Sequence, residues 1–281
     1  MQSRRSFFDS LKPRDVELGE KLGFGAFASV YKGKYRDEVV AIKKINGLSV
    51  GAAQAYDREI SAASEFSHHG IVGFKGGFRR GGNYFVVEEL MLGGTLSELI
   101  KRGEPSTMSQ FYSLFLPIVE GLAEMHERHF IHRDIKPDNI LLSTKSHPYK
   151  AKLADFGLTR WVEEEERKRM TIVGTVLYMA PEILEELPYS FECDIFSLGV
   201  VFLEALTGKK PAMDKARNDK YLISEDYIDA CTFVMKDVPD NLIALIKRMV
   251  CSPSALRPKA REIVTELKTL QKSSGGCCYI L

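Results

Sequence analysis

One charged stretch constrains this chain more than any other feature of its sequence. It reads His132-Arg133-Asp134-Ile135-Lys136-Pro137-Asp138-Asn139, and Asp155-Phe156-Gly157 follows it after a short interval typical of a strand. An aspartate can orient a hydroxyl group and accept its proton, a lysine can neutralise a phosphoryl group in transfer, and an asparagine with a second aspartate can hold metal ions. We therefore expect the fold to bring these side chains together at a site suited to phosphoryl transfer.

Bulk composition sets broad limits. The 281 residues, 44% of them hydrophobic, suffice for one large domain or two small lobes with a sizeable core. A formal net charge of +1, from 39 basic and 38 acidic side chains, gives no reason to expect nucleic-acid binding, which needs clustered positive charge. No apolar run reaches the roughly 18 to 20 residues of a spanning helix, and the first residues lack the apolar core of a secretion signal. We therefore expect a cytoplasmic protein. Its five cysteines lack the spacing of a zinc site, and an odd count with no signal peptide argues against a disulfide framework, so we expect reduced thiols.

The pattern of elements changes near Gly93-Gly94. Before this point, short β-branched or aromatic runs alternate with glycine, which predicts a twisted antiparallel sheet. Its expected strands lie in Leu22–Tyr31, Val39–Ile45, Ile71–Phe78 and Tyr84–Val87, and one helix is expected over Ala52–Phe66. Beyond it the chain is mainly helical, with helices expected over Met108–Arg128, Ser190–Leu206, Leu242–Val250 and Arg261–Leu270. Pro117 should weaken or bend the first of these.

The charged stretch and the triplet Asp155-Phe156-Gly157 resemble the catalytic loop and the metal-binding triplet of eukaryotic protein kinases. The resemblance implies that Asp134 is the catalytic base, that Lys136 contacts the transferred phosphate, and that Asn139 and Asp155 bind Mg²⁺. It covers residues 16 to about 270 and implies an α+β bilobal kinase fold. The N-lobe is expected over 16–90 and the C-lobe over 91–270, with an N-terminal extension at 1–15 and a flexible tail at 271–281.

A glycine-rich segment, Gly23-Phe24-Gly25-Ala26-Phe27-Ala28-Ser29-Val30, lies between two strand-like runs and so does not fit a dinucleotide-binding turn. In the kinase pattern Gly23 and Gly25 let the backbone approach the phosphates of ATP, and Val30 covers the adenine. Ala28 departs from that pattern, where a third glycine is usual. A plain hairpin is the alternative for this segment taken alone.

Val40-Ala41-Ile42-Lys43 follows on the next expected strand. A lysine inside a buried strand needs a partner, because an unpaired ammonium is costly to desolvate. Glu59, in the middle of the expected helix, matches the glutamate that pairs with this lysine in kinases and orients the ATP phosphates. A solvated helix face is the other interpretation of Glu59, since charged residues surround it.

The run from Tyr84 to Gly94 resembles the connection between kinase lobes, whose backbone hydrogen-bonds adenine. The residue at the back of the nucleotide pocket is either Glu88 or Val87, and an acid there would be unusual. The side chains and backbone expected to contact the nucleotide, beside the lysine and the glycine-rich segment, belong to Leu22, Ala41, Glu89, Met91 and Leu141.

The run from Gly174 to Glu182 resembles the end of the activation segment of serine/threonine kinases, and Lys136 and Thr175 favour the same class. Thr171, Thr175 and Arg133 are expected to be regulatory residues. Thr171 stands at the usual position of an activating phosphorylation site, and Arg133 would receive its phosphate. An ordinary loop threonine is the alternative. Two scaffold contacts are also expected, Asp194 against the catalytic-loop backbone and Arg257 with Glu182.

The last four residues, Cys278-Tyr279-Ile280-Leu281, fit the pattern for prenylation, with leucine favouring a geranylgeranyl group. One prenyl chain anchors weakly, so membrane association through this lipid would need a second signal such as Cys277. An arbitrary tail is the alternative. An unmodified mass of the protein from its native cell would rule out lipidation.

Taken together, the motifs predict an ATP- and Mg²⁺-dependent serine/threonine protein kinase, with protein substrates and activation by an upstream kinase or by itself. The charge pattern around Val16 to Ile45 is reminiscent of the tyrosine-kinase-like branch of this class. A pseudokinase scaffold is disfavoured because Lys43, Asp134 and Asp155 are all present. A tyrosine or dual-specificity kinase is disfavoured by Lys136 and Thr175.

Overall fold

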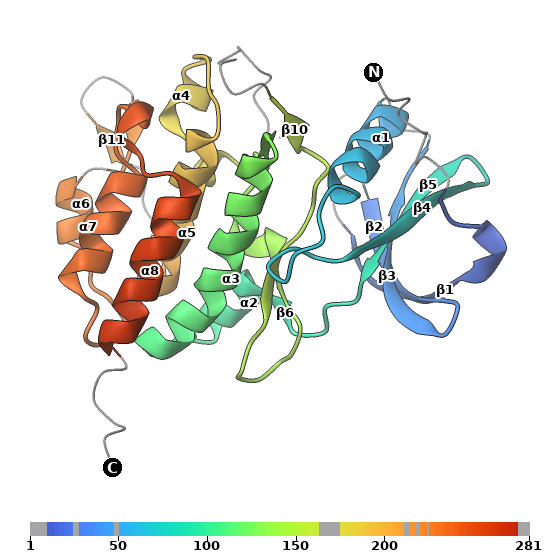
Figure 1. Cartoon of the computed structure of the whole chain (residues 1–281), viewed down its shortest axis with the longest axis horizontal. Helices are drawn as coiled ribbons and strands as arrows, with labels where there is room; N and C mark the ends of the chain where they lie inside the picture. Colours follow the sequence, from blue (N-terminus) through green and yellow to red (C-terminus); the bar gives the residue numbers. More distant parts are fainter. Residues whose placement is uncertain are drawn as a thin grey trace.

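The computed structural model describes residues 10–24, 28–47, 51–162, 175–210, 214–216, 220–223 and 225–274. These residues form two lobes, one built on a sheet and one mainly helical, joined by the chain after strand β5 (Figure 1). The predicted α+β bilobal architecture is confirmed. Within the described helices, none is both long and apolar enough to cross a membrane.

The sheet lobe contains five antiparallel strands in the order β1-β2-β3-β5-β4. Their bounds are Val16–Phe24, Ala28–Tyr35, Glu38–Ile45, Phe74–Arg80 for β4 and Asn83–Glu89 for β5. Successive side chains of a strand point to opposite faces of the sheet. Val40, Ile42 and Val87 therefore pack in a core on one face, while Lys43 and Val86 lie on the face toward α1. The strand expected from Ile71 begins only at Phe74, because Ile71 is buried in the core of the other lobe and makes a single bridge to Leu153.

Helix α1 (Ala52–Ala63) is the one α-helix in the described part of the sheet lobe, as predicted, although it ends three residues earlier than expected. Its buried residues include Ala52, Tyr56, Glu59, Ile60 and Ala63, which recur at helical spacing and form one face. Glu59 belongs to this face and is 1% exposed. The interpretation of Glu59 as part of a solvated face is therefore wrong.

The helical lobe surrounds α5 (Glu192–Thr207), whose residues from Cys193 to Thr207 are all buried. Beside it runs α3 (Met108–Glu127), which begins at a capping box formed by Thr107 and Gln110 and continues without a break through Pro117. The remaining helices are α2 (Leu96–Lys101), α4 (Pro181–Leu184), α6 (Glu225–Asp229), α7 (Asp240–Met249) and α8 (Ala260–Ser274). Helix α8 runs four residues beyond its predicted end, into the segment expected to be a flexible tail.

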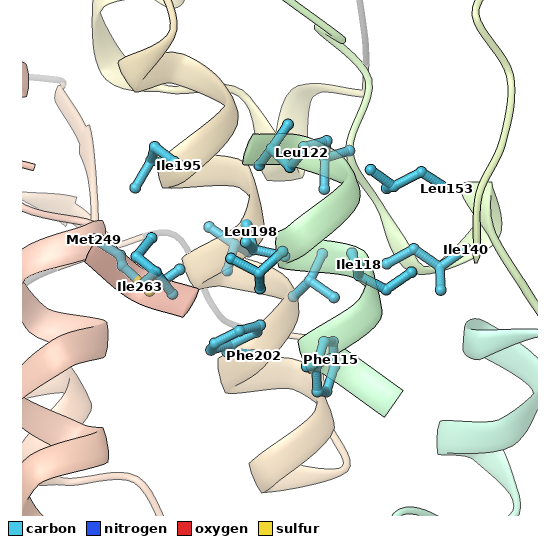
Figure 2. Packing of buried hydrophobic residues seen from close by; sticks show 14 of the residues in the cluster. Phe115, Ile118, Leu122, Ile140, Leu153, Ile195, Leu198, Phe202, Met249 and Ile263 are labelled. Atoms are coloured by element: carbon cyan, nitrogen blue, oxygen red, sulfur yellow. The ribbon is translucent and has the colours of Figure 1, made fainter. Parts of the chain in front are cut away.

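The main core lies between α3 and α5 and extends toward α7 and α8 (Figure 2). Phe115 and Leu122 of α3 face Leu198 and Phe202 of α5, and Leu153 lies at the edge toward the strands (Figure 2). Burying each such side chain contributes about 1.5–3 kcal/mol. The same core supports short strands: β6 (Gly94–Thr95), β7 (Phe130–Ile131), β8 (Ile140–Leu142), β9 (Ala151–Leu153) and β10 (Arg160–Trp161), with β11 (Asp214–Ala216) and β12 (Lys220–Leu222) elsewhere in the lobe. The charged stretch joins β7 to β8 and thus rests on a rigid base.

Candidate active site

The backbone of the charged stretch is fixed by one buried carboxylate. Asp194 of α5 is fully buried, and it accepts hydrogen bonds from the amides of His132 and Arg133, both at 2.8 Å, and from the ring of His126 at 3.0 Å. Arg133 has a positive φ of 69°, an uncommon conformation for a residue with a side chain. The predicted bracing role of Asp194 is confirmed, and its bonds hold the strained turn that presents Asp134.

Three polar side chains converge on the carboxylate of Asp134. Its Oδ2 accepts hydrogen bonds from Lys136 Nζ at 2.7 Å and from Asn139 Nδ2 at 2.9 Å, and its Oδ1 accepts one from the Thr175 hydroxyl at 3.3 Å. Lys136 Nζ also donates to Thr175 Oγ1 at 2.9 Å. Thr175, expected as a regulatory residue, thus has its hydroxyl within the cluster. The carboxylate of Asp134 is held in one orientation by donors on both oxygens.

Lys43 joins the sheet lobe to this site. Its Nζ donates to Glu59 Oε1 at 2.7 Å and to Asp155 Oδ1 at 2.8 Å. The predicted ion pair with Glu59 is confirmed. Burial opposes the charge on Lys43, but the carboxylates of Glu59, Asp155 and Glu88 outweigh it and raise the pKa of the lysine. The Lys43 ammonium in turn lowers the pKa of Asp155 to about 2, so both groups are charged at neutral pH.

Asp155 is positioned by its own triplet. It has a φ of 67°, and its Oδ1 accepts a hydrogen bond from the Gly157 amide at 3.3 Å. Phe156 is fully buried, with its ring 5.7 Å from that of His132 and 6.1 Å from that of Phe66, just beyond α1. The buried phenyl ring therefore ties the orientation of Asp155 to both lobes.

The donor set fits a magnesium ion. Within the described residues there is no group of three or more His, Cys, Asp or Glu side chains able to hold a metal by themselves. Mg²⁺ is usually bound by one or two carboxylates together with substrate phosphates and water. Asp155, whose side chain is 44% exposed, and Asn139 supply such a partial set.

The residues expected to contact the nucleotide come from the sheet, from the connection between the lobes and from β8 of the helical lobe. Gly23 pairs with Val30 across the β1–β2 hairpin, and a side chain at Gly23 would meet open space. Leu141 of β8 is only partly buried, unlike its neighbours, and so faces away from the core. Leu22 is exposed, and Met91 lies in the connection between the lobes. Gly25 falls outside the described residues.

The side chain of Glu89 has a different position from the one a nucleotide contact requires. Its carboxylate accepts hydrogen bonds from Lys152 Nζ at 2.6 and 2.9 Å and from the Gly73 amide at 3.1 Å. The Glu89 amide donates to the Gly73 carbonyl at 2.7 Å. These contacts hold the connection against the helical lobe, so that any nucleotide contact of Glu89 falls to its backbone, as expected for this segment.

The strand register decides between Glu88 and Val87. Ala41 is paired with Glu88 and Lys43 with Val86, so these four residues share the face that carries the lysine. Val87 is fully buried in the opposite core. Glu88, and not Val87, therefore lies on the face of Lys43, the face expected to line the back of the nucleotide pocket. A one-residue slip would have exchanged the two.

Glu88 should make stability depend on pH. Burial raises its pKa from 4.5 to about 7, with Glu59 and Asp155 adding to the rise and Lys43 opposing it. The contribution of the neutral Glu88 carboxyl to the free energy of unfolding is therefore fully present below pH 4.5, its pKa in the unfolded chain, and is lost as pH rises through about 7. We expect Glu88→Gln to be more stable than the wild type by about 2–3 kcal/mol at pH 8 and by less than about 1 kcal/mol at pH 5, measured by urea unfolding. Glu38→Gln, at an exposed position, is the control. If the difference in unfolding free energy between Glu88→Gln and the wild type were the same at both pH values, the raised pKa of Glu88 would be contradicted.

Two further expectations concern the activation segment. Arg133 Nε donates to the Leu158 carbonyl at 2.6 Å, and its Nη1 lies 3.5 Å from the Tyr189 hydroxyl. Thr171 is outside the described residues, so its phosphorylation stays a prediction. Arg257, in contrast, forms the expected paired contact with Glu182, at 2.6 and 2.9 Å.

A lysine clamped by two acids, an oriented aspartate beside an asparagine, and a two-lobed frame define a nucleotide-dependent phosphotransferase. Comparison with known proteins agrees, since residues 16–267 match the model of the protein kinase domain. The chain belongs to the protein kinase family.

Two similar proteins come from Dictyostelium discoideum. The "RasGEF domain-containing serine/threonine-protein kinase X" is 33% identical over 261 residues, which cover 92% of this chain and 27% of that protein. The "Probable serine/threonine-protein kinase kinX" is 33% identical over 269 residues, covering 93% of this chain and 24% of that protein. The chain spans about a quarter of the length of these relatives.

Proposed function

We propose that this protein kinase uses ATP and Mg²⁺ to phosphorylate serine and threonine hydroxyls of protein substrates. The observation that carries the proposal is the convergence of Lys136, Asn139 and Thr175 on Asp134, opposite the pair of Lys43 and Asp155. Asp134 orients the substrate hydroxyl and accepts its proton, while Lys136 neutralises charge on the transferred group. Positioning and electrostatic stabilisation supply most of the catalysis.

The same residues fit a nucleotide with its metal. Lys43 would contact the phosphates, and Asp155 with Asn139 would hold Mg²⁺. The ion would screen phosphate charge and hold the phosphates in place. Leu22, Val30, Ala41 and Leu141 would pack around the base, and the backbone of Glu89 and Met91 would hydrogen-bond its edge.

The preference for serine and threonine rests on two supports. Lys136 bridges Asp134 and Thr175, the arrangement that the kinase resemblance associates with this class. Both relatives carry "serine/threonine-protein kinase" in their names. Phosphoamino-acid analysis of mixed generic substrates should therefore yield phosphoserine and phosphothreonine. Phosphotyrosine as the main product would overturn the preference while leaving a kinase.

Phosphorylation of Thr171, by an upstream kinase or by the chain itself, is proposed to activate the enzyme. The guanidinium of Arg133 lies beside the Leu158 carbonyl, just after the Asp155 triplet, and beside the Tyr189 hydroxyl, and it carries the positive charge that a phosphate would pair with. We expect Thr171→Ala to lower kcat at least about tenfold, because the variant cannot acquire the phosphate whose charge would order the activation segment. Thr171→Ser, which keeps a phosphorylatable hydroxyl, should stay near wild type.

In an Arg133→Gln background the loss of Thr171 should add little, because the receptor of the phosphate is already gone. Full activity of Thr171→Ala in a preparation shown by mass to be unphosphorylated would refute this regulation. Lipidation of Cys278 stays a prediction from the sequence because residues 275–281 are outside the described part of the chain. A cytoplasmic or membrane-associated location likewise stays a prediction.

A further inference from the structure

The residues on the ligand-facing side of β3 and β5 divide the pocket into two ends. Lys43, paired with Val86, marks the end that meets the phosphates. Two residues earlier on the strand, Ala41 is paired with Glu88, and Glu88 directly precedes Glu89 in the connection. Since every second residue of a strand points to the same face, Val86 and Glu88 are successive residues on this face of β5. Glu88 is the one nearer to the connection between the lobes, where the base is expected to bind. The backbone of Glu88 therefore lies on the base side of the lysine, and its carboxylate is also close enough to interact with Lys43, Glu59 and Asp155.

The hydrogen bonds of the cluster leave this carboxylate available to a ligand. Lys43 Nζ donates to Glu59 and Asp155, at 2.7 and 2.8 Å, and both bonds involve other acids. In the part of the chain that the structure describes, no protein donor hydrogen-bonds the side chain of Glu88. A partly buried carboxylate accepts hydrogen bonds and is costly to leave without a donor. The pocket thus offers a strong acceptor beside the base.

We infer that Glu88 determines the purine specificity of this kinase by accepting a hydrogen bond from the 6-amino group of adenine. The inference rests on the proposed function and names the base of its nucleotide. Guanine and hypoxanthine carry a 6-oxo group, whose lone pairs would face the carboxylate without a proton between them. A site built to accept a hydrogen bond rejects an analogue that lacks the donor, because its own polar group is then left unpaired.

The protonation of Glu88 gives a second signature. Burial raises the pKa of Glu88 to about 7. Of the charged groups facing it, Glu59 from α1 and Asp155 from the triplet add to the rise and Lys43 from β3 opposes it, so the protonated form is favoured below neutral pH. A carboxylic acid has an O–H group that can donate to a 6-oxo group, whereas a carboxylate cannot. Discrimination between amino and oxo purines should therefore weaken as pH falls from 8 to 6.

The test compares kcat/KM for MgATP and MgITP, because the two bases differ at the 6-position and in the proton on the adjacent ring nitrogen. Glu88→Gln adds an amide donor at the same position, so we expect the ATP/ITP ratio to fall at least tenfold, with ITP used better than by the wild type. Glu88→Thr, which is smaller, should also lower the ratio. The control Glu38→Gln should keep the wild-type ratio, and melting curves confirm that each variant is folded.

The result that would overturn the inference is an ATP/ITP ratio within twofold of wild type in both Glu88 variants. This outcome differs from failure of the proposed function, in which the wild type transfers phosphate from neither nucleotide. In that case calorimetric dissociation constants for the same nucleotides and variants replace kcat/KM. The same tenfold change in their ratio is then expected, and an unchanged ratio again overturns the inference.

Discussion

Asp134→Asn is expected to lower kcat at least about 10³-fold while nucleotide binding stays near wild type. An amide cannot accept the proton of the attacking hydroxyl, and loss of a positioned base costs about 10²–10⁴-fold. The substitution keeps the size of the side chain and one acceptor oxygen for Lys136 or Asn139, which hydrogen-bond it at 2.7 and 2.9 Å. The fold around it should therefore persist. Steady-state kinetics with a generic peptide, beside calorimetry with MgATP, measures both quantities.

Asp138→Asn is the matched control for this variant, because it makes the same change at an exposed position of the same loop. Its kcat should stay within about twofold of wild type, as expected for a surface substitution that removes no catalytic contact. If Asp134→Asn kept more than about a tenth of wild-type kcat, the assignment of Asp134 as the base would be wrong.

Asp194→Ala is expected to cost about 3–5 kcal/mol of unfolding free energy and to abolish activity. The variant leaves the amides of His132 and Arg133 buried without an acceptor, and an unsatisfied buried group costs about 1–3 kcal/mol. Burial opposes ionisation of Asp194, but hydrogen bonds from His126 and the Arg133 amide hold its pKa below the ordinary value. A domain stable by about 5–15 kcal/mol would lose a large share of that stability.

Urea unfolding with a linear extrapolation measures the loss at Asp194. Asp240→Ala, at the exposed start of α7, is the control and should cost no more than about 1 kcal/mol. A loss of less than about 1 kcal/mol for Asp194→Ala would show that the loop does not depend on this carboxylate.

The sequence allowed much of the site to be predicted because its motifs are local. Asp134, Lys136 and Asn139 fall within six residues, and the hydrophobic period located the main helices. A partner for Lys43 could be expected because a buried ammonium requires one, and the kinase resemblance pointed to Glu59 as that partner. In contrast, the bond of Glu89 to Lys152 joins residues far apart in the chain, with no pattern that signals it.

The choice between Glu88 and Val87 shows the same limit. Adjacent residues of a strand point to opposite faces, so counting from two glycines left the assignment open until the pairing with Ala41 was known.

Element ends were also less predictable than element types. Helix α8 continues to Ser274 because its helical hydrogen bonds extend into a serine-containing stretch that composition alone assigned to the tail.

The most direct test of the central claim is the amount of phosphate that the wild-type chain transfers from γ-labelled ATP to generic protein substrates over time. The geometry of Lys43, Asp134 and Asp155 predicts repeated turnover that requires Mg²⁺ and is lost in Asp155→Asn. Binding of MgATP without transfer above the level of Asp134→Asn would contradict it, and would assign the chain to the scaffolding pseudokinases instead.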